Sequence, residues 1–257
     1  MILRNLSRSL KEQNWTAIWI EFVLLVAGVF LGIQVANWNA ALGDGKEATT
    51  YRQRLADDLR SELSGIETRM AYYQRVRSHA LNALAGAQQP AEQANAQFLI
   101  DAYQATQEWP FNPARSAYEE MISAGRMNLI PDLALRKRLA VHYSELGEYL
   151  PSWSREAEYR NSMRTLMPVA LQERIHIACE TFAVDQAGSS QLMPESMSCA
   201  VSFTPEEIAS AVAAINLAPD LAAQINRQVS VIDEKLRMFS DRHDQVNAMI
   251  DYMKVAP

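Results

Sequence analysis

Between Asn14 and Ala40 the chain is almost entirely apolar, with the sequence NWTAIWIEFVLLVAGVFLGIQVANWNA and one acidic residue, Glu21. As a helix, residues 16–38 would be about 35 Å long at about 1.5 Å per residue. A membrane hydrocarbon core is about 30 Å thick, so this length is sufficient to cross it. The pattern therefore predicts a transmembrane helix over residues 14–42, preceded by a basic segment over residues 1–13.

Tryptophans flank this segment. Trp15, Trp19 and Trp38 lie near its ends, where interfacial aromatic residues are expected. A buried helix of a soluble protein rarely combines such flanks with this length. A cleaved signal peptide also has an apolar core, but the polar Gln34 and Asn37 make a poor small-residue cleavage site. We therefore favour an uncleaved signal anchor over both alternatives.

The orientation of the span follows from the charges on its two sides. Arg4, Arg8 and Lys11 precede it, and the excess of Lys and Arg over the following segment is small. Short basic segments stay on the cytoplasmic side. We expect a single-pass protein in the lipid of a bacterial inner membrane, with a cytoplasmic N-terminus and residues 46–257 in the periplasm.

One face of the predicted span carries small residues and the carboxylate. Glu21, Gly28, Gly32 and Ala36 are spaced close to multiples of 3.6 residues. Gly28 and Gly32 form a GxxxG pair, which allows two membrane helices to pack closely. A charged carboxylate in a span is unfavourable, less so near an interface. Glu21 would therefore lie near the headgroups, contact a partner helix together with the glycines, or move protons with a partner channel.

Two long segments, residues 46–85 and 219–253, have apolar residues at alternating spacings of three and four. A Gly-Asp-Gly stretch at 43–45 predicts a flexible joint before the first one. Packing the two apolar faces together would bury both. The predicted fold class is all-α, with one N-terminal transmembrane helix and a soluble helical bundle over residues 46–257. The stripes are Leu55, Leu59, Leu63, Ile66, Met70, Tyr73, Ala80 and Leu84, and Leu221, Ile225, Val229, Ile232, Leu236, Phe239, His243, Val246, Ile250 and Met253.

Shorter helices are predicted between the two long ones. Pro113, after an asparagine, is expected at the first position of a helix. Pro151 is expected to end another, and a bent helix is expected over residues 152–181. Thr204 and Glu207 form a capping box that predicts a further helix start.

Composition and charge narrow the class of protein. The net charge is −6 and no basic patch contains aromatic residues, which argues against nucleic acid as a partner. Only 9 Gly and 10 Pro occur in 257 residues, in agreement with a helical fold. Cys179 and Cys199 would form a disulfide in an oxidising compartment and remain thiols in a reducing one. The expected periplasmic location favours the disulfide.

The sequence contains few candidates for chemistry. We find no motif for nucleophilic hydrolysis, nucleotide binding, zinc proteolysis or dithiol exchange. The nearest metal-like pattern is ERIHIACE, with Glu173, His176 and Glu180, but a di-iron bundle needs a second Glu-x-x-His and two more glutamates. We therefore predict no metal, no cofactor and no enzymatic activity. His79 and His243 have no partner that the sequence identifies.

An aromatic group surrounds the predicted turn WPFNP. It consists of Trp109, Phe111 and Tyr118. Such a group is more often a core plug than a ligand cage. It is nevertheless the possible ligand pocket that the sequence offers.

The span also resembles a known signature. IEFVLLVAGVFLGIQVANWN is similar to the N-terminal motif of bacterial membrane-anchored proteins of the domain-of-unknown-function 6090 family, in which Glu opens a span that ends in Gln-x-x-Asn-Trp-Asn. The corresponding residues are Glu21, Gln34, Asn37, Trp38 and Asn39.

Two further stretches resemble the same family. YRQRLADDLRSEL is similar to its tyrosine-led helix, and AYEEMISAGRMNLIPDLALRKRLAVHYSEL to its central block. The resemblance covers about the first 150 residues and does not include the cysteine loop. It implies a membrane-anchored helical protein with no assigned activity and no catalytic residues. The central block matches at Ser123, Gly125, Leu129, Ile130, Leu135 and Arg136.

Two functional hypotheses follow from the sequence. The favoured one is a non-enzymatic, membrane-anchored helical protein that oligomerises, or assembles with another membrane protein, through its transmembrane helix. The alternative is a periplasmic sensory or small-ligand-binding module that acts through a partner.

Overall fold

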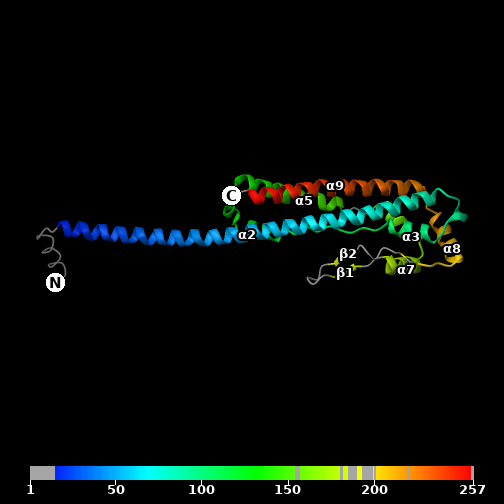
Figure 1. The fold of residues 1–257 in the computed structure, drawn as a ribbon, viewed down its shortest axis with the longest axis horizontal. Helices are drawn as coiled ribbons and strands as arrows, with labels where there is room; N and C mark the ends of the chain where they lie inside the picture. Colours follow the sequence, from blue (N-terminus) through cyan, green and yellow to red (C-terminus); the bar gives the residue numbers. More distant parts are fainter. Residues whose placement is uncertain are drawn as a thin grey trace.

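A computed structural model describes residues 15–153, 157–179, 182–184, 190–192, 199, 201–218 and 220–255. It confirms the all-α class, because the described part is a long helix joined to a helical bundle (Figure 1). The exceptions are two three-residue strands, β1 (Phe182–Val184) and β2 (Ser190–Leu192), which pair antiparallel.

The N-terminal helix, α2, is continuous over 73 residues from Trp15 to Ala87. Its first half projects from the molecule and its second half lies in the bundle (Figure 1). The flexible joint predicted at 43–45 is therefore wrong. An interior glycine costs a helix only about 1 kcal/mol relative to alanine, which the long helical segments on both sides are sufficient to offset.

The projecting half of α2 is long and apolar enough to cross a membrane. None of its most apolar stretch is buried inside the described part of the molecule. Its large apolar side chains, from Trp15 to Leu42, are all about half exposed or more. These side chains therefore lack a cover within the described part of the chain.

The last helix, α9 (Leu221–Val255), lies antiparallel along the second half of α2. Arg52 donates to the carbonyl oxygen of Met253 at 3.1 Å, while Arg77 binds Asp233 at 2.5 Å near the opposite end. The two long helices therefore pack together, as their apolar patterns predict.

Six positions of the predicted stripes are only partly buried: Leu63, Met70, Leu84, Leu221, Leu236 and His243. Glu62 and Arg242 are fully buried between the long helices, whereas their neighbours Leu63 and His243 are only partly buried. A charged pair at the centre of an apolar interface can be accommodated only if its members compensate each other. The apolar pattern alone therefore shifted both assignments by one residue.

Short helices complete the bundle. α3 and α8 lie at the end far from the apolar half of α2, while α5 lies beside α9 (Figure 1). The remaining elements are η1 (Ala91–Gln93), α3 (Ala96–Gln104), α4 (Ser116–Ser123), η2 (Met127–Leu129), α5 (Leu133–Trp153), α6 (Glu158–Leu166), α7 (Val169–Cys179) and α8 (Pro205–Ile215).

Several predicted helix ends differ from those observed. α5 continues through Pro151 to Trp153, because a proline in the last turn removes only one backbone hydrogen bond. The bent helix expected over 152–181 is two helices, separated at Pro168. α4 begins three residues after Pro113. The capping box of α8, by contrast, is confirmed, with both of its hydrogen bonds present.

Candidate functional site

The small-residue stripe of α2 faces open space. A Cβ atom placed on Gly28 or Gly32 would meet no atom within 4 Å. Glu21 and Ala36 are exposed on the same helix. The motif residues at the end of the span, Gln34, Asn37, Trp38 and Asn39, are also exposed.

The bundle begins at the end of this apolar half. Gly125 ends α4 with a φ of +66°, a conformation that suits glycine, and the following N–H of Arg126 bonds to the carbonyl oxygen of Met121 at 2.8 Å. This turn directs the guanidinium of Arg126 to Asp44 at 3.7 Å and to Glu47 at 3.3 Å. The predicted motif glycine therefore closes the bundle onto α2 beside its apolar half.

The neighbouring contact also joins α4 to α2. Glu120 accepts hydrogen bonds from Arg54 at 2.6 Å and from Tyr51 at 3.1 Å, and its backbone carbonyl accepts one from the motif residue Ser123 at 3.0 Å. The hydrogen bond from Arg54, followed by that from Tyr51, lowers the pKa of Glu120.

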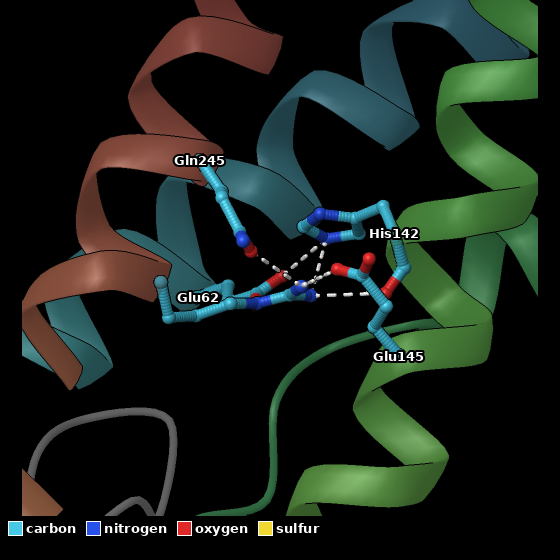
Figure 2. Close-up of polar contacts among 5 residues, drawn as sticks. Glu62, His142, Glu145 and Gln245 are labelled. Atoms are coloured by element: carbon cyan, nitrogen blue, oxygen red, sulfur yellow. Dashed lines mark hydrogen bonds and ion pairs between the residues drawn. The ribbon is translucent and has the colours of Figure 1, made fainter. Parts of the chain in front are cut away.

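Three charged or polar residues from three helices meet in the core (Figure 2). Glu62 on α2, His142 on α5 and Arg242 on α9 have side chains that are at most 3 % exposed. Arg242 Nε donates to Glu62 Oε1 at 2.8 Å, and His142 Nε2 lies 2.9 Å from Glu62 Oε2. We call these residues the buried triad.

His142 Nε2 lies between a donor and an acceptor of the triad. Arg242 Nη2 lies 2.9 Å from His142 Nε2, but it also reaches the carbonyl oxygen of His142 at 3.2 Å. A guanidinium can only donate and a carboxylate can only accept, so the position of the imidazole proton depends on which of these two contacts Nε2 makes.

A groove opens beside the triad, between α5 and α9. It has a volume of about 540 Å³. Gln245 on α9 and Glu145 on α5 connect the triad to it: Arg242 Nη1 lies 3.4 Å from the oxygen of Gln245 and 4.0 Å from a carboxylate oxygen of Glu145 (Figure 2). The lining residues are Ala134, Lys137, Arg138, Val141, His142, Glu145, Gln245, Ala248 and Met249.

The triad and the groove were not predicted from the sequence. A signal was present, since Glu62 and Arg242 each occupy a position that fits the spacing of an apolar stripe. The pattern shows that each is a charged residue at a position expected to be buried, but it does not show that the two residues contact each other.

The predicted aromatic pocket is not formed as one cage. The guanidinium of Arg69 lies 4.1 Å from the ring centre of Trp109 and 5.2 Å from that of Phe111. Tyr118 instead stacks on Tyr143 with ring centres 4.2 Å apart. These aromatic residues therefore pack as core plugs in two different groups.

Cys179 and Cys199 form a disulfide with Cα atoms 4.6 Å apart. It joins the end of α7 to the segment before α8. The side-chain amide of Gln104 on α3 donates to the sulfur of Cys199, a weak acceptor, at 3.7 Å. The disulfide therefore lies against α3 of the bundle.

Two histidines that lacked a partner in the sequence have acidic neighbours. His79 Nδ1 lies 2.6 Å from a carboxylate oxygen of the buried Asp101, and His243 Nε2 lies 3.4 Å from Glu67. In the described part of the chain, no group of three or more His, Cys, Asp or Glu side chains could hold a metal ion. Glu180 of the metal-like pattern lies outside the described residues.

No protein-family model matches this chain, and no match was found among curated proteins or solved structures. The resemblance to the domain-of-unknown-function 6090 family therefore depends on the sequence motifs alone.

Proposed function

We propose that this protein is a non-enzymatic membrane anchor with a helical bundle, which assembles with itself or with another membrane protein through its transmembrane helix. The observation that carries the proposal is the continuity of α2. The first half of this helix carries the open small-residue stripe, and its second half packs in the core of the bundle. Contacts between helices within the membrane would therefore fix the orientation of the bundle outside it.

The chemistry of the stripe supports this proposal. Without a side chain at Gly28 and Gly32, a second helix can approach the backbone of α2 closely. Glu21, on the same face, would be bonded to a polar group of the partner helix. Polar contacts of this kind contribute about 0.6–2 kcal/mol in membranes, so assembly needs both the close packing and the polar contact.

We further propose that the N-terminus is cytoplasmic and the bundle periplasmic. The basic residues before the span support this orientation. The disulfide supports it independently, because disulfides persist in oxidising compartments. A periplasm-active reporter fused after Pro257 should be active, and activity of a cytoplasm-specific reporter at the same position would reverse the topology.

The assembly is tested with a membrane two-hybrid assay. Replacing Gly28 and Gly32 by Ile should abolish the signal, because the branched side chains hold the helices apart. A control with Val23→Leu and Phe30→Leu changes apolar residues on the opposite face and should keep it. Equal signals from the two variants would refute assembly through the stripe.

A further inference from the structure

The groove between α5 and α9 has the dimensions of a small-molecule site. Its volume of about 540 Å³ lies within the range of about 300–1,000 Å³ that is usual for ligand pockets. Val141, Ala248 and Met249 give it an apolar wall. Val141 is 47 % exposed, so this wall is open to an incoming molecule.

The groove is held in shape by the buried triad. Glu62 anchors Arg242 from α9 and His142 from α5 to α2 through contacts of 2.8–2.9 Å. Because these side chains lie in the core, the two walls of the groove cannot move apart without breaking buried hydrogen bonds. A ligand would therefore meet a preformed site.

The charged residues of the groove are unequal in sign. Lys137 and Arg138 contribute two cations, and Glu145 is the single carboxylate among the lining residues. Glu145 lies 4.0 Å from Arg242, so part of its charge is already compensated. The guanidinium of Arg138 stacks on the ring of Tyr252 at 4.5 Å, which fixes its position.

A second groove, between α2 and α9, provides a comparison. It is lined by Arg52, Arg60 and Lys254 among others. Each of these cations already has a partner: the carbonyl oxygen of Met253, Asp57 and Asp251, respectively. By contrast, Lys137 forms no salt bridge with a described residue, while Arg138 stacks on Tyr252 and its charge is only partly offset by nearby Asp132.

We propose that the α5–α9 groove binds a small amphipathic carboxylate. Its carboxylate would bind between Lys137 and the fork of Arg138, whose geometry suits a planar anion. Its apolar part would cover Val141, Ala248 and Met249. The site differs from the aromatic group predicted from the sequence, and it does not depend on assembly through the transmembrane stripe.

The proposal is tested on the full chain in nanodiscs of zwitterionic lipid, by isothermal titration calorimetry with empty nanodiscs subtracted. The probes are 4-phenylbutyrate and its neutral amide, 4-phenylbutyramide. We expect the carboxylate to bind at least about tenfold more tightly than the amide, because only the carboxylate forms charge-assisted hydrogen bonds. Equal affinities, or no binding of either probe, would overturn the proposal.

Variants locate the site. Lys137→Gln with Arg138→Gln should weaken binding of 4-phenylbutyrate about tenfold or more. Ala248→Phe should block the groove while leaving both cations in place, and since Ala248 is exposed the fold should be retained. Arg237→Gln removes an exposed cation elsewhere on α9 and should leave the affinity unchanged.

The same measurements separate this proposal from transmembrane assembly. Unchanged binding in Ala248→Phe would place the carboxylate elsewhere and overturn the proposal. The variant with Ile at positions 28 and 32 should bind the probe as the wild type does, because these positions lie in the span. Loss of binding in that variant would contradict the independence of the two sites.

Discussion

The buried triad should dominate the stability of the bundle. The informative change is Glu62→Gln, which keeps the size of the side chain but removes the charge that faces Arg242. The guanidinium, with 1 % of its side chain exposed, would then keep only the more distant carboxylate of Glu145, at 4.0 Å, as a counter-charge among the described ion pairs. His142 Nε2 would also face an amide in place of the carboxylate, so one substitution disturbs all three helices.

The size of the effect follows from the geometry. Two opposite charges 2.8 Å apart attract by about 6 kcal/mol at an effective dielectric constant of about 20. The amide oxygen of glutamine can still accept from Arg242, which offsets part of this loss. Breaking a buried pair by changing one partner costs about 3–5 kcal/mol, and we expect Glu62→Gln to lie in that range. Since domains are stable by about 5–15 kcal/mol, the variant should be close to unfolding.

The assay is urea unfolding of the full chain in mild detergent, followed by circular dichroism at 222 nm. The apolar half of α2 is expected to stay helical in detergent and so to contribute a constant signal. Glu234→Gln is the control, because Glu234 is exposed on α9; its effect should be below about 0.5 kcal/mol. The double variant Glu62→Leu with Arg242→Met should lose less stability than Glu62→Gln, since it leaves no unpaired charge.

Two results would refute this reasoning. A loss below about 1 kcal/mol in Glu62→Gln would show that water reaches and stabilises Arg242. A double variant that is less stable than Glu62→Gln would show that the ion pair is itself strongly stabilising rather than a compensated cost.

The other predictions concern the glycines of α2 and the acidity of α4. Gly45→Ala should raise the free energy of unfolding by about 0.5–1 kcal/mol, because the added Cβ meets no atom within 4 Å. Gly86→Ala should lower it, because the added Cβ would lie 2.5 Å from the ring of Phe98. Equal shifts of the two variants in urea unfolding would contradict this. Arg54→Gln should raise the lowered pKa of Glu120, measured by carbon NMR of the carboxyl group. Because the pKa of Glu120 is lower in the folded protein than in the unfolded one, its charged form stabilises the fold at pH values above the unfolded pKa, and this stabilisation disappears as the pH falls through the folded pKa. In Arg54→Gln the folded pKa is higher, so the stabilisation should be smaller and should disappear at a higher pH. An unchanged pKa would exclude Arg54 as the main cause.

The sequence by itself determined the elements whose signals are local or periodic. The apolar segment around Gly28, the two long stripes and the capping box at Thr204 all appear in the structure where the pattern indicates them. These features depend on neighbouring residues, on helical periodicity or on segment length. The order of residues is therefore sufficient to predict them.

Whether a helix continues through an unfavourable residue depends on the stability of the helix on both sides, and not only on the local preference of that residue. The stretch at 43–45 has the composition of a joint, and Pro151 has that of a helix end, yet α2 and α5 continue through them. The local penalty is about 1 kcal/mol for each glycine and larger for proline. Whether helix on both sides outweighs that penalty cannot be decided from the residue itself.

Only the tertiary structure decided the site. Glu62, His142 and Arg242 are separated by 80 and 100 residues, and each could have been a solvated polar residue on its own helix. Burial of a charge is tolerated when its partner arrives from another helix, and that depends on how α2, α5 and α9 are rotated about their axes. A stripe of apolar residues sets this rotation only to within about one residue, which is the difference between Arg242 and His243. The groove and the position of its cations follow from the same rotation, which the packed bundle fixes and the linear pattern leaves open.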